Sequence, residues 1–174
     1  MAESLSGQLL IASPALEDYF RRTVVLVVEH NDEGAFGLVL NKRSHSRVDE
    51  AVPGLFEMIE ADEMLHIGGP VQPSAVTAVA EHDDPADATR LVVGAVGMVD
   101  LDSIPAISRV RVFAGYAGWG PGQLDAELEA EGWIRDDARV DDPFSDGDLW
   151  AQTLERKGGS YALLARMPAD PALN

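Results

Sequence analysis

The segment 109–128 constrains the fold more than any other part of the sequence, because its pattern changes twice. Charged and apolar residues alternate over 109–113, which is the period of a half-exposed strand. Glycines then crowd the chain, and a helix is expected after them. Gly120 is placed to act as its N-cap, Pro121 as its first residue, and Gln123 to bond back to the cap. The segment therefore predicts a strand, a glycine-rich turn and a capped helix.

The end of this helix is also predicted. Leu124 and Leu128 are four residues apart and form an apolar face. Gly132 suits the position after the helix, where Trp133 would pack back on Leu128.

The glycine turn before the helix permits two interpretations. The free N–H groups of a helix N-terminus can bind an anion, with Trp119 as an exposed apolar wall beside Gly120, Gly122 and Gln123. Alternatively, the glycines only allow a tight turn packed under a buried Trp119. The spacing matches neither the dinucleotide Gly-x-Gly-x-x-Gly pattern nor a phosphate-binding loop.

The same segment resembles the YqgE/AlgH family of bacterial proteins through residues 113–124, Phe-Ala-Gly-Tyr-Ala-Gly-Trp-Gly-Pro-Gly-Gln-Leu. Four further stretches match in the family order: 7–14, 27–31, 34–41 (ending at Asn41) and 68–71. The resemblance implies a strongly curved, barrel-like mixed β-sheet flanked by helices. The family is functionally uncharacterised, and its AlgH name implies a role in transcriptional regulation.

The remaining apolar runs predict mixed α and β structure rather than a doubly wound parallel sheet. Predicted strands are 9–12, 23–28, 35–40, 64–67, 75–80, 91–93 and 97–99. Residues 148–157 are expected to form a helix, as are 53–60. The aspartate-rich stretch 135–147 is expected to be a loop, and 161–165 a strand, with a helix as the alternative. We therefore expect an α+β fold.

Length and charge limit the classes of function. The 174 residues suit one domain spanning 1–174. The net charge is −17, from 30 acidic and 13 basic residues, and no basic reading element is evident, so direct binding to nucleic acid is not expected. The chain has no cysteine, no membrane-length apolar run and no signal peptide, which indicates a cytoplasmic protein.

Candidate site residues come from the stretches that match the family. His30 and His66 are the candidates for catalysis, although each could instead bond the backbone at a strand end. Candidate ligand-binding residues are Asn41, Gly68, Gly69, Trp119, Gly120, Gly122 and Gln123. No paired metal-ligand spacing occurs, so neither a metal nor a cofactor is expected.

We therefore expect a non-enzymatic binding or regulatory module that acts through a protein partner or a small anionic ligand. The alternative is a small-molecule enzyme, such as a hydrolase. It would use His30 or His66 with an anion site at Gly120–Gln123. The sequence leaves the oligomeric state open.

Overall fold

The computed structural model describes residues 4–52, 55 and 63–168. Its strands are β1 (Gln8–Ala12), β2 (Val24–Asn31), β3 (Gly34–Val39), β4 (Arg43–Arg47), β5 (Met64–Ile67), β6 (Val71–His82), β7 (Arg90–Val93), β8 (Val96–Met98), β9 (Ile107–Trp119) and β10 (Trp133–Asp137). The helices are α1 (Val48–Ala51), α2 (Gln123–Glu129), α3 (Leu149–Lys157) and α4 (Ser160–Leu164), with short 3-10 turns η2 (Pro85–Asp87) and η3 (Asp142–Phe144). The predicted helix at 53–60 lies outside the described residues, apart from Leu55.

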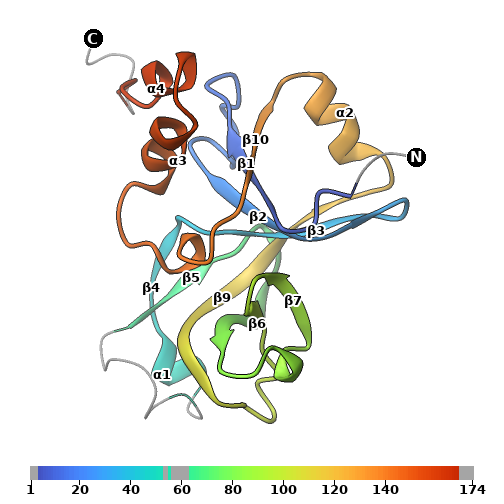
Figure 1. Ribbon diagram of the computed structural model, residues 1–174, viewed down its shortest axis with the longest axis vertical. Helices are drawn as coiled ribbons and strands as arrows, with labels where there is room; N and C mark the ends of the chain where they lie inside the picture. Colours follow the sequence, from blue (N-terminus) through green and yellow to red (C-terminus); the bar gives the residue numbers. More distant parts are fainter. Residues whose placement is uncertain (1–3, 53–54, 56–62, 169–174) are drawn as a thin grey trace.

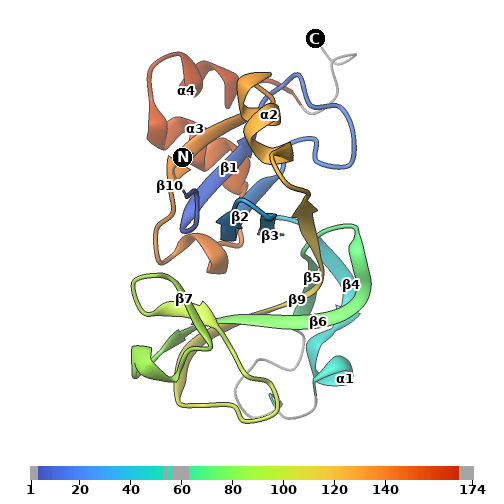
Figure 2. The same cartoon turned by 90° about the vertical axis from the view of Figure 1, so that its right-hand side faces the viewer.

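The strands form one sheet in the order β10-β1-β2-β3-β9-β6-β8-β7, with β4 and β5 attached to the side of β9. Neighbours along this path are antiparallel, whereas β5 runs parallel to β9. Figures 1 and 2 show the sheet bending at β9, which joins an upper part (β1, β2, β3, β10) to a lower part (β4 to β8). The expected α+β class with flanking helices is confirmed. The sheet is open, because β10 and β7 end the described path without pairing with each other.

Strand β9 is longer than predicted, and the predicted glycine turn within it is wrong. Gly118 and Trp119 still pair with β3, opposite Phe36 and Ala35. Gly115 has a φ of 74°, a left-handed conformation that glycine adopts without strain. The glycines thus let one strand continue through a bend, from its pairing with β6 to its pairing with β3.

The upper part of the sheet is apolar on both faces, which explains the continuous apolar run of β2. Side chains such as Leu26 pack under α3, where Trp150 and Leu154 are buried. Side chains on the opposite face of the sheet, such as Val25, pack under α2 with Leu124 and neighbouring aromatic rings. Alternation along β1 and β2 therefore supplies two cores, one on each face.

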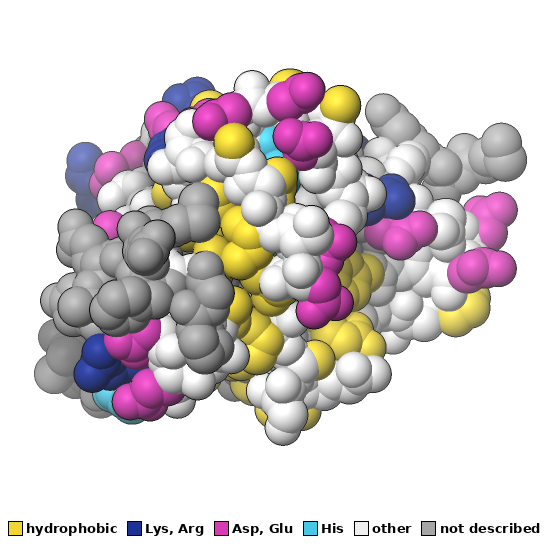
Figure 3. Space-filling view, turned by 90° about the horizontal axis from the view of Figure 1, so that it is seen from below, with side chains coloured by type: hydrophobic (Ala, Val, Ile, Leu, Met, Phe, Trp, Pro, Cys, Tyr) yellow, Lys and Arg dark blue, Asp and Glu magenta, His cyan; other side chains and the backbone are white. Residues whose placement is uncertain are grey.

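A third apolar cluster lies in the lower part, around Ala78 and Ala80 of β6 and Val112 of β9. Figure 3 views the molecule from this end and shows apolar side chains gathered near the centre, with acidic groups on several sides. The loop that includes Leu101 and Ile104 packs against this cluster. β9 therefore contributes to the cores of both parts.

The C-terminal region differs from the sequence prediction in two places. Residues 133–137 form β10, although most of them were expected to be a loop. Residues 160–164 form α4, which was the alternative interpretation of that stretch. The helix at 149–157 is confirmed, and the Asp148 side chain caps it by accepting the Ala151 N–H at 3.1 Å.

Candidate functional site

Gly68 and Gly69 lie where the backbone after β5 passes close to the backbone of β9. Gly68 donates its N–H to the Ala114 carbonyl and accepts the Val39 N–H, both at 2.8 Å, so it joins β9 to the end of β3. A Cβ atom on Gly69 would collide with the backbone of Tyr116. Both glycines therefore have a packing role that explains their residue type. Ligand binding by these two glycines stays a prediction.

Asn41 has a similar structural role at the start of β2. Its Oδ1 accepts the Val24 N–H at 3.0 Å, and its Nδ2 donates to the Arg22 carbonyl at 2.9 Å. Arg22 has a positive φ of 56°, which is uncommon for a residue with a side chain. The asparagine side chain thus holds an unusual turn and the strand that follows it.

Trp119 is 7% exposed, so the expectation of an exposed apolar wall is wrong. Its ring forms an aromatic cluster with Phe20 and Trp133, at centroid distances of 6.4 and 6.3 Å, and those two rings lie 5.6 Å from each other. The indole N–H groups of Trp119 and Trp133 both donate to Oε1 of Glu127, at 3.3 and 3.0 Å. Gln123 donates to the other oxygen of Glu127 at 3.0 Å. This carboxylate therefore fastens α2 over the aromatic side chains.

Helix α2 begins two residues later than predicted, with Gly122 at the N-cap position in a left-handed conformation. The predicted contact from Gln123 is nevertheless present, since its Oε1 accepts the Gly120 N–H at 3.0 Å. The helix ends in a Schellman motif with Glu131 at the left-handed position, rather than Gly132 as predicted. The Gly132 N–H reaches the Glu127 carbonyl and the Glu131 N–H the Leu128 carbonyl.

His30 lies beside α2, but its ring is already bonded. Its Nδ1 accepts the Leu5 N–H at 3.0 Å, so in the neutral ring the proton is on Nε2. Nε2 lies 3.6 Å from Oδ1 of Asp125. A cavity of about 210 Å³ is lined by His30, Asp125, Ser4, Asn31 and Asp32. The ring therefore presents an N–H to a carboxylate, and no free lone pair.

His66 is buried in the lower part, apart from His30. Its Nε2 lies 3.2 Å from Nη1 of Arg111, a group that can only donate, so the imidazole proton is on Nδ1. Burial and the neighbouring Arg111 guanidinium lower the pKa of His66 from 6.5 to about 4, against the opposing effects of the Met64 backbone and Asp146. His66 is therefore neutral at physiological pH.

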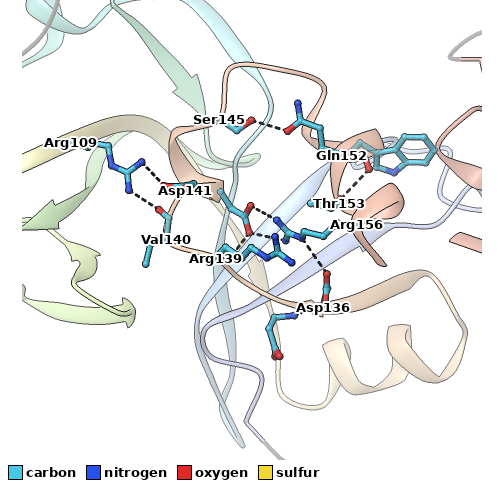
Figure 4. A network of polar contacts seen from close by, with 12 residues as sticks. Arg109, Asp136, Arg139, Val140, Asp141, Ser145, Gln152, Thr153 and Arg156 are labelled. Carbon is cyan, nitrogen blue, oxygen red and sulfur yellow. Dashed lines mark hydrogen bonds and ion pairs between the residues drawn. The ribbon is translucent and has the colours of Figure 1, made fainter. Parts of the chain in front are cut away.

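Arg109 and Arg111 share one face of β9, as their alternation predicted, and both hold the segment 139–146. Arg111 is 5% exposed and donates to the Ser145 carbonyl at 2.9 Å and to Asp146 at 2.7 Å. Arg109 bonds Asp141 at 2.8 Å, as Figure 4 shows, and its guanidinium lies 4.4 Å from the Phe144 ring centroid. These arginines therefore anchor η3 on the sheet.

A second anchor of this region is a bidentate pair between Arg156 and Asp142, at 2.9 and 3.0 Å. Asp142 is 5% exposed, and its Oδ2 also accepts the Arg139 N–H. Arg156 lies 3.8 Å from Asp136 of β10 as well. The segment 139–146 of the predicted loop is therefore ordered, and it connects β9, β10 and α3 through these ion pairs.

An open cleft of about 800 Å³ lies along β10, at the edge of the upper part of the sheet. Figure 1 shows β10 between α2 and the pair α3 and α4. The cleft is lined by every residue of β10 and by neighbours from β1, α2 and its C-terminal turn, α3 and α4: Gln8, Leu128, Glu129, Glu131, Lys157 and Tyr161. Sequence reasoning missed this site because 135–147 was interpreted as a loop. The signal that could have revealed it is Trp133-Ile134, an apolar pair directly after the glycine that follows α2.

The structure thus brings together one group of predicted site residues. Trp119, Gly120 and Gln123 meet at the start of α2, with His30 beside Asp125 of the same helix. Among the described residues, neither Gly120 nor Gln123 lines the His30 cavity. Within the same described residues, no three histidine, aspartate or glutamate side chains are grouped as a metal site, and no helix is long and apolar enough to cross a membrane.

A family model described as AlgH-like matches residues 9–162, most of the chain. The chain belongs to the AlgH-like family. It is 38% identical to the UPF0301 protein SCO2948 of Streptomyces coelicolor over 186 residues, covering 98% of this chain and 96% of the relative. It is 41% identical to the UPF0301 protein RHA1_ro03630 of Rhodococcus jostii over 181 residues, covering 97% and 90%.

Two solved structures share the fold of this AlgH-like chain. The crystal structure of DIP2367 from Corynebacterium diphtheriae superposes with a TM-score of 0.86 at 30% identity, covering 93% of this chain and 92% of that one. The solution structure of the AlgH protein from Pseudomonas aeruginosa gives a TM-score of 0.71 at 26% identity, covering 98% and 100%. The resemblance drawn from residues 113–124 is therefore confirmed at the level of family and fold.

Proposed function

We propose that this AlgH-like chain is a non-enzymatic binding module that acts in regulation through a protein partner, without direct contact with DNA. The observation that carries the proposal is the use of both candidate histidines inside the fold. The lone pair of His30 is used by Leu5, and that of His66 by Arg111. A general base needs a lone pair directed at its substrate, so both histidines favour a structural role.

The surroundings of α2 support binding over hydrolysis. The carboxylate of Asp125 lies beside His30, and the Gly120 N–H is already bonded by Gln123. A carboxylate near a helix start opposes the binding of a second anion, such as a phosphate or an oxyanion intermediate. The net charge of −17 likewise opposes binding to nucleic acid and favours partners with basic surfaces.

Substitutions that keep each hydrogen bond but remove the imidazole test this proposal. Asparagine at position 30 places its Oδ1 where Nδ1 accepts the Leu5 N–H. Glutamine at position 66 places an oxygen where Nε2 meets Arg111. A strain lacking the gene would be complemented with the wild type, His30→Asn or His66→Gln, and its transcript profile compared with that of the parent.

We expect deletion to change the profile and all three genes to restore it. The thermal melting of each purified variant is the control for folding. A variant that folds like the wild type but restores nothing would contradict the proposal and favour an enzyme that uses that histidine. A deletion strain with an unchanged profile would contradict the regulatory role.

A further inference from the structure

The outer edge of β10 is an unpaired sheet edge that lies in the cleft. The Ser13 N–H bonds the Gly132 carbonyl at 3.0 Å, and the Ala138 N–H bonds the Gly7 carbonyl at 3.3 Å. Antiparallel strands alternate between bonded and non-bonded pairs. The same alternation through β10 turns the backbone N–H and carbonyl groups of Trp133 and Arg135 toward the outer edge. Among the described strands, β1 alone pairs with β10.

The cleft around this edge has both the shape and the charge of a peptide groove. Helix α2 and its C-terminal turn contribute Leu128, Glu129 and Glu131 to one wall. Lys157 and Tyr161 line the opposite wall, where the Lys157 ammonium already lies 5.1 Å from the Tyr161 ring centroid. Four acidic residues line the cleft against two basic ones, and the apolar side chains between them can cover aliphatic groups.

We propose that this cleft binds an extended segment of a partner protein that carries lysine or arginine at alternate positions, added as a strand to the free edge of β10. The proposal rests on the proposed function as a protein-binding module, and it names the site and the chemistry of the partner. The backbone of the segment would pair with Trp133 and Arg135, while its basic side chains would meet Glu129, Glu131 and Asp137. Main-chain pairing gives such complexes affinity, and side chains give them specificity.

Charge argues against a second copy of this chain as the occupant. An antiparallel pair of β10 strands would place Asp136 and Asp137 of both copies in one cleft, and each copy carries a net charge of −17. Like charges brought together in this way destabilise an interface. A basic segment relieves the same repulsion.

The probe for the experiment is a ten-residue peptide of alternating lysine and valine. It would be titrated into the ¹⁵N-labelled full chain at physiological salt. We expect the largest amide shifts, and slower hydrogen exchange, at Trp133 and Arg135. One control peptide replaces lysine with glutamate. Another carries N-methyl groups on alternate amides, which removes the donors that strand pairing needs. Neither is expected to bind.

The test variant is Glu129→Lys with Asp137→Lys, both exposed in the cleft. Its matched control is Asp87→Lys with Asp102→Lys, which makes the same change of charge at exposed positions in the lower part. We expect the cleft variant to weaken binding of the lysine peptide about tenfold or more, from two reversed surface pairs. The control variant should bind nearly as well as the wild type. Thermal melting checks that both variants fold.

Several outcomes would overturn the proposal. It fails if the lysine peptide does not bind the wild type, or if both variants weaken its binding equally. It also fails if the N-methylated peptide binds as well as the unmodified one, or if the amide shifts centre away from β10. A dimer of the wild type that sedimentation detects and that the cleft variant loses would assign the edge to a second copy. The proposed function still stands after any of these outcomes, provided that the His30→Asn and His66→Gln genes restore the transcript profile. If folded His30→Asn or His66→Gln protein does not restore the profile, the proposed function is contradicted, whether or not a peptide binds at β10.

Discussion

The buried pair of His66 and Arg111 predicts a specific loss of stability in weak acid. The pKa of His66 falls from 6.5 to about 4 on folding, chiefly because of burial and then because of the Arg111 charge. In the unfolded chain, His66 therefore binds a proton as the pH falls through about 6.5. In the folded chain, its imidazole stays neutral until about pH 4. Stability is lost as the pH falls through this window, since protons favour the state that binds them.

The size of the loss follows from the shift. A difference of roughly 2.5 pKa units, at about 1.4 kcal/mol each, amounts to about 3 kcal/mol between pH 7 and pH 4. The His66→Gln variant keeps an acceptor for Arg111 but has no proton to bind. The free energy of unfolding of the wild type should therefore fall by about 3 kcal/mol more than that of His66→Gln over this range.

Urea denaturation at half-unit steps from pH 7.5 to pH 4 measures both curves. Carboxylates titrate in the same range in both proteins, so the difference between the curves isolates His66. NMR of the histidine nitrogens should show the Nδ1–H tautomer of His66 at pH 6. Parallel stability curves, or an imidazole that titrates near pH 6.5 in the folded chain, would refute the reasoning.

Three further outcomes are expected. Trp119→Ala should lower the free energy of unfolding by about 3–5 kcal/mol in urea denaturation, because the ring is buried in contact with two other aromatic rings, and a loss below about 1 kcal/mol would show that it does not belong to the core. Gly69→Ala should cost about 2 kcal/mol or more by the same assay, because its Cβ would meet the Tyr116 backbone, whereas the Cβ of Gly120→Ala would only contact the Gln123 side chain at an ordinary distance and that substitution should cost less than about 1 kcal/mol. The chain should not bind double-stranded DNA at physiological salt, given its net charge of −17, and submicromolar, salt-sensitive binding by fluorescence anisotropy would contradict this.

The parts of the fold that the sequence predicted are those set by local periodicity. The run at 23–28 became a strand buried on both faces, and the capped helix at 149–157 formed as expected. The alternation at 109–113 correctly placed Arg109 and Arg111 on one face of β9. In these segments local preference and tertiary packing agree.

The parts that were missed depend on distant partners. The glycines of β9 suggested a turn, but they allow Gly68 and Gly69 to cross the strand closely, a contact between segments about 45 residues apart in the chain. β10 was hidden because Asp136 is stabilised by Arg156 from α3, and no local rule shows that pairing. The burial of Trp119 was missed because it depends on groups outside the glycine turn, such as Glu127 within α2, which accepts its N–H.

The order of the strands has a consequence for the chain during synthesis. β1 lies between β2 and β10, so its edge at Leu9 and Ile11 is completed only by residues 134–136. The outer edge of β3 is likewise completed only by the end of β9. About a hundred residues separate β3 from β10, and at roughly 5–20 residues per second their synthesis takes roughly 5–20 seconds, during which β1 lacks the partner for its outer edge. Nascent-chain truncations that stop before β10 are therefore the lengths at which a chaperone should bind this protein most strongly.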